Sequence, residues 1–232
     1  MNFEVLPGPP LAELARTAMA RAYAAVVSCA GPRGPRVTTV PVRVSQEGHP
    51  ILLPRRGSAL ARQLAAGPAM VTVTVPADAP FCALRLVGMA APLARARSLG
   101  AGPNVGSGEP VAYPVTPQSL EFTGASLAQV ALAQYETAAP DPFRHHAPAV
   151  LRHLEDWHMA ELVRCVQMNG IAAAECVVPR GLDRYGLELL VFTPGGLSAV
   201  RLAFPDGPVT GIEQVPASIR AVLTCRCDGR PG

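Results

Sequence analysis

Short segments of alternating apolar and polar residues dominate the first half of this chain, and turn residues separate them. Residues 23–29 place every second side chain, from Tyr23 to Cys29, on one side, and residues 36–44 alternate in the same way. The sequence Gly31-Pro-Arg-Gly-Pro35 between these segments is typical of a turn. Since a period of two is the pattern of a half-buried strand, and short turns join antiparallel strands, the sequence predicts an antiparallel sheet.

Helices are predicted on either side of these strands. Residues 10–22 carry apolar side chains at helical spacing, and residues 58–66 begin with Ser58 as an N-cap and end at Gly67-Pro68. Further strands are predicted at 51–53, 71–75, 81–90 and 114–122, and a surface loop at 91–113. The first part of the chain therefore combines an antiparallel sheet with flanking helices.

The last third of the chain has a different order of elements. Residues 148–169 predict one helix of about 22 residues, with Pro148 in its first turn and Gly170 after its end. Strands are predicted near 171–178, 182–192 and 198–204, and a helix at 216–224. We therefore expect an α+β chain with a domain at 1–137, a linker at 138–147, and a smaller α-β-β-β-α domain at 148–227.

The composition narrows the possible chemistry. Apolar residues make up 49% of the 232 residues, and no apolar run reaches the roughly 18 residues of a membrane span. The N-terminus lacks the pattern of a signal peptide, so a cytoplasmic protein is expected. The chain has no lysine, which excludes a Schiff-base lysine and leaves arginine to bind anions. There is no nucleophile motif, and no basic-aromatic pattern indicates nucleic acid.

Basic side chains cluster just before the predicted helix at 58–66. Arg55, Arg56 and Arg62 surround Ser58 in the sequence Arg55-Arg-Gly-Ser-Ala-Leu-Ala-Arg62. Guanidinium groups, a hydroxyl and a helix N-terminus are together suited to a phosphate or a carboxylate. The other interpretation is an exposed loop with solvated arginines.

Among the histidines, His158 is the candidate metal ligand, because it shares a helical face with Leu154 and Leu162. A half-buried imidazole can ligate iron, although it more often packs in a core. His153 lies five residues earlier, which is roughly 140° around a continuous helix, so we expect the two histidines not to chelate one metal.

Two further arginines, Arg184 and Arg201, are predicted on paired strands of a hairpin. On one face they would form a fork for a carboxylate-bearing ligand; otherwise they would be in structural ion pairs with neighbouring acidic residues. Near the C-terminus, the pair Cys225 and Cys227 is a weak indication of a metal site, since zinc sites usually have a two-residue spacer and a second pair.

Two stretches of the chain resemble known protein modules. Residues 11–92 resemble the FMN-binding split barrel of the pyridoxamine-phosphate-oxidase-like superfamily; the resemblance is carried by Thr38-Thr-Val-Pro-Val42, Gly48-His-Pro-Ile-Leu-Leu53 and Ser58-Ala-Leu-Ala-Arg-Gln-Leu64. Residues 148–224 are similar to the C-terminal domain of haem-utilisation proteins, through His153…His158, Asp183-Arg-Tyr-Gly-Leu187 and Val200-Arg-Leu-Ala-Phe204. Together they look like the haem-oxygenase-like split-barrel proteins.

This resemblance implies an antiparallel split β-barrel, a homodimer, and cofactor clefts between subunits. The first function that it implies is haem binding, with degradation of haem if an external electron donor is used; the cofactor contacts would be Arg55, Arg56, Ser58, Arg62, Arg184 and Arg201. The second is an FMN-dependent oxidoreductase, although Ala59 and Leu60 stand where FMN-binding relatives have basic residues. The third is a non-catalytic regulator that binds another protein.

Overall fold

The computed structural model describes residues 8–31, 34–77, 81–92, 108–124 and 127–224. The chain divides into two compact units between Pro140 and Asp141. We call residues 10–140 the N-terminal unit and residues 141–224 the C-terminal unit. The boundary falls inside the segment 138–147 that composition predicts as a linker. Asp141 and Phe143 of that segment are buried, so these residues belong to the packed part of the C-terminal unit.

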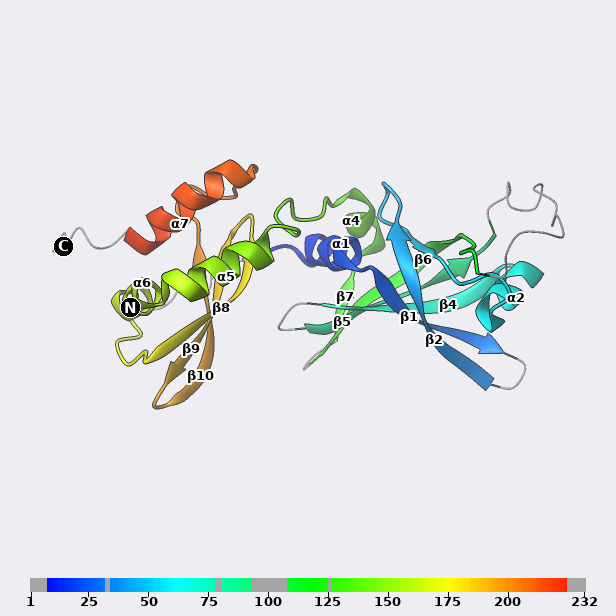
Figure 1. Cartoon of the computed structure of the whole chain (residues 1–232), viewed down its shortest axis with the longest axis horizontal. Helices are drawn as coiled ribbons and strands as arrows, with labels where there is room; N and C mark the ends of the chain where they lie inside the picture. Colours follow the sequence, from blue (N-terminus) through cyan, green and yellow to red (C-terminus); the bar gives the residue numbers. More distant parts are fainter. Residues whose placement is uncertain (1–7, 32–33, 78–80, 93–107, 125–126, 225–232) are drawn as a thin grey trace. The chain divides into compact units, whose positions relative to one another are not determined.

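An antiparallel sheet forms the N-terminal unit (Figure 1). Its strands are β1 (Ala24–Gly31), β2 (Gly34–Val44), β3 (Pro50–Leu52), β4 (Ala69–Pro76), β5 (Phe81–Ala90), β6 (Tyr113–Gly124) and β7 (Ala128–Val130). They are ordered β3-β2-β1-β4-β5-β6-β7, and β3 also pairs with β6. The pairing of β1 to β6 therefore closes on itself, which is consistent with the split barrel that the resemblance implies.

Among the described residues, the helices that accompany this sheet are α1 (Leu11–Arg21), α2 (Ala59–Ala66) and α4 (Leu132–Thr137). The prediction that Ser58 caps the second helix is confirmed, because its hydroxyl accepts a hydrogen bond from the Ala61 backbone N–H at 3.2 Å. The buried Tyr113 fixes the same helix by donating its hydroxyl to the Ala61 carbonyl at 3.1 Å. Strand β7 and helix α4 were not predicted from the sequence.

A buried polar cluster joins α1, α4 and the turn between β2 and β3. The Arg16 guanidinium donates to the Gln46 carbonyl at 3.1 Å, and its carbon lies 5.4 Å from the ring centroid of Tyr135. Tyr135 in turn donates its hydroxyl to the Gly48 carbonyl at 2.5 Å. Burial raises the pKa of Tyr135 to about 12, although the positive charge of Arg16 opposes that shift. The cluster therefore fixes the turn that contains Gln46 and Gly48.

The C-terminal unit consists of helices and one antiparallel sheet (Figure 1). Its elements in chain order are α5 (Ala147–Trp157), α6 (Met159–Met168), β8 (Cys176–Asp183), β9 (Gly186–Thr193), β10 (Gly196–Ala203), the short 3-10 helix η1 (Ile212–Gln214) and α7 (Val215–Thr224). The strands are ordered β10-β9-β8. The expected α-β-β-β-α order is therefore α-α-β-β-β-α, and the prediction of one helix over 148–169 is wrong.

The chain interrupts that helix at His158, whose backbone has φ −128° and ψ 20°. A straight helix of 22 residues would be about 33 Å long. The eight-residue strand β8 spans only about 27 Å. Helices α5 and α6 both pack on β8, and α6 also packs on α7. Two shorter helices at an angle can make all three contacts, whereas one straight helix would extend past the sheet.

No helix among the described residues is both long enough and apolar enough to span a membrane.

Candidate functional site

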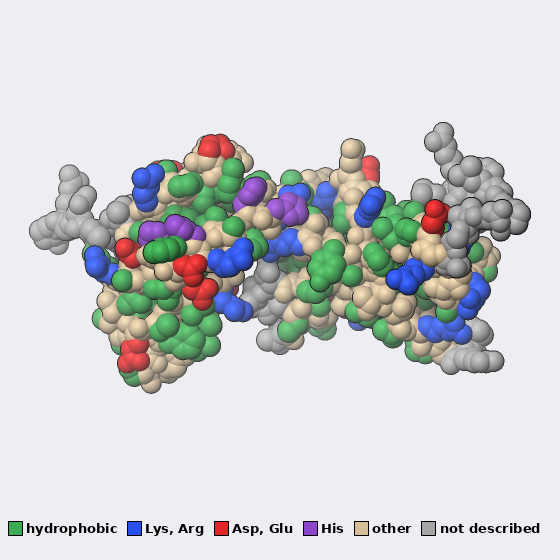
Figure 2. Space-filling view, viewed as in Figure 1, with side chains coloured by type: hydrophobic (Ala, Val, Ile, Leu, Met, Phe, Trp, Pro, Cys, Tyr) green, Lys and Arg blue, Asp and Glu red, His purple; other side chains and the backbone are tan. Residues whose placement is uncertain are grey.

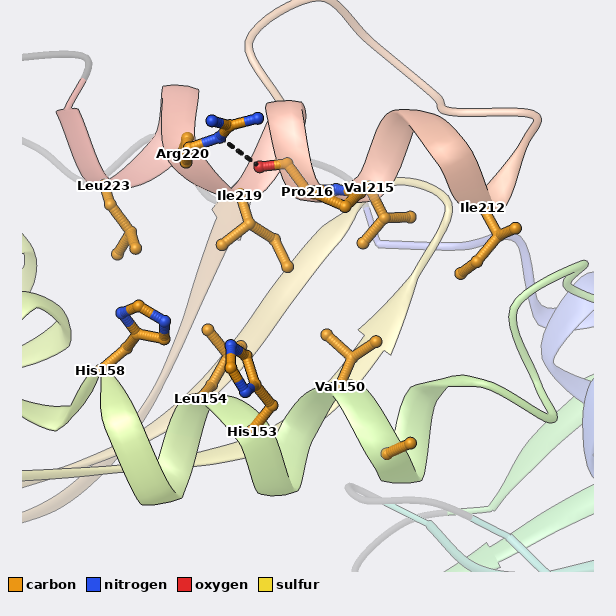
Figure 3. A pocket seen from close by; sticks show the side chains of 11 residues that line it. Val150, His153, Leu154, His158, Ile212, Val215, Pro216, Ile219, Arg220 and Leu223 are labelled. Carbon is orange, nitrogen blue, oxygen red and sulfur yellow. Dashed lines mark hydrogen bonds between the residues drawn. The ribbon is translucent and has the colours of Figure 1, made fainter.

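A groove of about 520 Å³ lies between α5 and the segment formed by η1 and α7, within the C-terminal unit. Figure 3 shows side chains from the two sides pointing toward one another across it. We call it the α5–α7 groove. Its volume is within the ~300–1,000 Å³ that is typical of sites for small molecules and cofactors. Its lining is mainly apolar: Ala149, Val150, Leu154, Ile212, Val215, Pro216, Ile219 and Leu223, with His153, His158 and Arg220 as the polar members.

The two histidines lie side by side at one end of the α5–α7 groove (Figure 3). Their ring centroids are 5.1 Å apart, and the ring planes make an angle of 65°. His158 is half-buried and His153 is exposed. The expectation that they point about 140° apart on one helix is therefore wrong. The helix ends at His158, so the direction of that side chain is no longer set by the spacing along α5.

The backbone at His158 is held from both sides. Its N–H donates to the Leu154 carbonyl at 2.9 Å, which ends α5, and its carbonyl accepts from the Leu162 N–H at 3.0 Å, which begins α6. These two bonds satisfy backbone groups that a helix interruption would otherwise leave without partners. The imidazole is therefore attached to a fixed point in the wall of the groove rather than to a loose loop.

Arg220 supplies the positive charge at the groove. It lies on α7, it is exposed, and its Nε donates to the Pro216 carbonyl at 3.3 Å, one turn earlier. Arg220 was not predicted from the sequence, because a single arginine on a short C-terminal helix has no distinctive pattern. Arg220 lies one turn after Pro216 and opposite α5, and only the folded unit shows that this position belongs to the groove. In Figure 2, histidine side chains are visible in separate groups on the face that the view shows.

Arg184 and Arg201 are both engaged with carboxylates of their own unit. Arg184 lies in the two-residue turn between β8 and β9, not on a strand as predicted. Its Nε is 3.8 Å from an Asp141 carboxylate oxygen. Arg201, on β10, donates to the Asp183 carboxylate, and both side chains are about four-fifths buried. The sequence left two interpretations open, a fork for a carboxylate-bearing ligand and structural ion pairs. The geometry of Arg184 and Arg201 has the features of structural ion pairs.

The segment with Arg55, Arg56, Ser58 and Arg62 lies in the N-terminal unit, at the start of α2. Its backbone is fixed by an isolated bridge between Arg55 and Pro110 and by a hydrogen bond from the Arg56 N–H to the Glu109 carbonyl at 2.8 Å. The three arginine side chains are exposed, and Arg62 donates to the carbonyl of Gly57. Exposed guanidinium groups beside a helix N-terminus remain able to bind an anion.

Two further predictions, a metal site at Cys225 and Cys227 and a homodimer, stay predictions. Cys225 and Cys227 lie outside the described residues. Among the described residues, no group of three or more histidine, cysteine, aspartate or glutamate side chains is placed to hold a metal ion. The homodimer stays a prediction; the outer faces of β1, β2 and β4 carry the exposed apolar residues Val26, Val37 and Met70.

Comparison with known proteins shows the fold. No protein-family model matches the chain, and no curated protein matches it. The structure of a heme binding protein from Mycobacterium smegmatis is similar over 95% of this chain and 98% of that one, with a TM-score of 0.65 and 21% sequence identity. The chain therefore shares the fold of that protein over nearly its whole length, which is consistent with the expected split barrel.

Two other solved structures are more distantly similar. The protein Atu2129, of unknown function, from Agrobacterium tumefaciens matches 94% of this chain and 98% of its own at 19% identity, with a TM-score of 0.40. A protein from Clostridium acetobutylicum related to general stress protein 26, of the pyridoxinephosphate oxidase family, matches 49% of this chain and 89% of its own at 13% identity, with a TM-score of 0.39.

Proposed function

We propose that this protein binds haem in the α5–α7 groove, with His158 as the ligand of the iron. The observation that carries the proposal is the groove itself, a mainly apolar site with a half-buried imidazole in its wall. The proposal is supported by the fold that the chain shares with a heme binding protein.

The residues of the groove fit the chemistry of haem. A porphyrin is flat and apolar over most of its surface, and the aliphatic side chains of α5 and α7 would exclude water from it. Histidine is a common axial ligand of haem iron. The Arg220 guanidinium at the groove is suited to a propionate, because arginine binds carboxylates through charge-assisted hydrogen bonds. When bound, haem would supply redox chemistry, and the protein would supply the ligand, the apolar walls and the charge.

A haem titration of the purified full-length chain, followed by absorbance, tests this function. We expect a Soret band that saturates at one haem per chain. His158→Ala should weaken haem binding at least tenfold, or about 1.4 kcal/mol, because it removes the iron ligand. His145→Ala is the matched control, since His145 is exposed and lies outside the groove lining; its affinity should equal that of the wild type. Equal affinity of all three proteins would contradict the assignment of His158.

The same experiment distinguishes binding from degradation. If the protein degrades haem, the Soret band of the loaded protein disappears after an electron donor is added with catalase present. If it only binds haem, the band persists. Degradation is therefore a second step that the titration alone neither requires nor excludes.

An FMN-dependent oxidoreductase is the second candidate, and the observation that favours it is the segment Arg55–Arg62 at the start of α2. There the exposed guanidinium groups and the helix N-terminus could bind the phosphate of the cofactor. A parallel FMN titration, followed by flavin fluorescence, separates the two candidates. Saturable FMN binding that is weakened by Arg62→Ala, without haem binding, would favour the flavin. Binding of neither cofactor would favour the regulator that the resemblance also implies.

A further inference from the structure

We propose that His153 and His158 together form a binding site for a divalent first-row transition metal ion in the haem-free protein. This goes beyond haem binding, because it concerns a free metal ion held by two side chains of this chain. The observation that carries the proposal is a pair of neighbouring imidazoles. His153 lies on α5 and His158 directly follows its end, and their ring centroids are 5.1 Å apart.

The interruption of the helix creates this pair. On a continuous helix, side chains five residues apart diverge, whereas those four residues apart face the same way; histidines with that four-residue spacing bind zinc in metalloproteases. In this protein the backbone leaves the helical conformation at His158, and the ring of His158 lies edge-to-face with that of His153. Both side chains point from the α5 side toward α7 (Figure 3). His153 and His158 are five residues apart in sequence, but the interruption brings them as close together as two histidines four residues apart on a continuous helix.

The surroundings leave the metal accessible. His153 is exposed and His158 is half-buried, so water and a metal ion can reach the pair. The remaining neighbours in the groove lining are aliphatic apart from Arg220, and the described residues provide no third histidine, cysteine or carboxylate for the site. Water molecules would complete the coordination. Such a site is open, as catalytic zinc sites are, rather than closed, as structural zinc sites are.

The donor set determines which metals bind best. Neutral imidazole suits zinc, copper and nickel, whereas the oxygen ligands that calcium and magnesium prefer are absent from the pair. For a given set of nitrogen ligands, affinity rises from Co²⁺ through Ni²⁺ to Cu²⁺ and falls again at Zn²⁺. We therefore expect Cu²⁺ to bind most tightly and Mg²⁺ not to bind.

Calorimetric titration of Cu²⁺ into the haem-free, full-length protein tests the proposal. The protein carries Cys82→Ser, Cys176→Ser, Cys225→Ser and Cys227→Ser, so that neither the exposed thiols nor those near the C-terminus bind or reduce the metal. We expect one Cu²⁺ per chain, at least tenfold weaker binding in His153→Ala and in His158→Ala, and weaker binding of Ni²⁺ and Zn²⁺ than of Cu²⁺. Electron paramagnetic resonance of the Cu²⁺ complex should show coupling to two imidazole nitrogens.

The control is a protein in which His145 and His146, the exposed histidines before α5, are both replaced by alanine. Its Cu²⁺ affinity should equal that of the parent, and far-UV circular dichroism should show that all variants keep their helices. The proposal is overturned if no saturable site is found, or if Cu²⁺ affinity survives in both His153→Ala and His158→Ala. His153→Ala decides the matter if His158→Ala fails to fold, because His153 is exposed and caps neither helix. Haem binding is measured separately, so either claim can fail alone.

Discussion

Replacing Gly48 with alanine is expected to destabilise the N-terminal unit by about 2–5 kcal/mol. Gly48 has φ +89°, a left-handed conformation that costs other residues about 1–2 kcal/mol. An added Cβ would also lie 1.2 Å from Arg16 Nη1. Arg16 is only 8% exposed and is held by the Gln46 carbonyl, so displacing it costs about 1–3 kcal/mol more, as overpacking of a core does.

Differential scanning calorimetry measures this effect, and Gly57→Ala is its matched control. Gly57 also has a left-handed φ of +76°, but no atom lies within 4 Å of the position of its Cβ. The control should therefore show only the conformational cost of about 1–2 kcal/mol. We expect the Gly48 variant to unfold at a temperature about 10 °C below that of the wild type, and below that of the control. Equal unfolding temperatures for the two variants would show that Arg16 moves aside freely.

The second large effect is expected for Asp141→Ala, which should destabilise the C-terminal unit by about 2–4 kcal/mol. The Asp141 carboxylate is buried, accepts the backbone N–H of Phe143 at 2.7 Å and accepts that of Arg184 at 2.8 Å. It also lies beside the Arg184 guanidinium. Alanine would leave these two N–H groups without the acceptor that they have in the wild type, and it would remove a carboxylate beside a largely buried positive charge.

Urea unfolding followed by far-UV circular dichroism gives the free energy of unfolding for this variant. Asp141→Asn is the control, because its amide oxygen still accepts one of the two hydrogen bonds. We expect its loss of stability to be about half of that for alanine. A free energy of unfolding for Asp141→Ala equal to that of the wild type would contradict the structural role of Asp141 and Arg184.

Local patterns in the sequence were sufficient to predict most strands and several turns. Alternation of side chains depends only on the two-residue period of a strand, so β1, β2, β4 and β5 lie close to their predicted positions. The Ser58 cap was also predictable, because its hydrogen bond to Ala61 joins residues three apart in sequence. Closure of the sheet through β3 and β6 brings together residues about 60 positions apart, and no local pattern encodes it.

The hairpin between β8 and β9 shows why the prediction of the arginine fork differed from the structure. The Asp183 carboxylate accepts the backbone N–H groups of Tyr185 and Gly186 at 2.8 and 3.2 Å. Asp is suited to such a turn, and its side chain competes with strand pairing there. The apolar residues that follow Gly186 made the whole segment resemble one strand. Arg184 therefore falls in a turn, and the distant Asp141 becomes its partner.

The candidate site was predictable only in part. The apolar stripe identified His158 as a half-buried histidine, but the interruption of the helix depends on the packing of α5 and α6 against β8. The closeness of His153 and His158 follows from that interruption. The spacing on a continuous helix therefore predicted, wrongly, that the two side chains diverge. The opposite wall of the groove comes from α7, about 60 residues away in sequence, and only the fold brings it near.

Nuclear magnetic resonance of the full-length chain, with and without ferric haem, tests the location of the proposed site most directly. The unpaired electrons of the iron broaden the backbone amide signals of nearby residues. Binding in the α5–α7 groove predicts broadening around Leu154, His158 and Ile219, with the signals around Arg62 unchanged. Broadening confined to Arg55–Arg62, with sharp signals throughout α5 and α7, would contradict it.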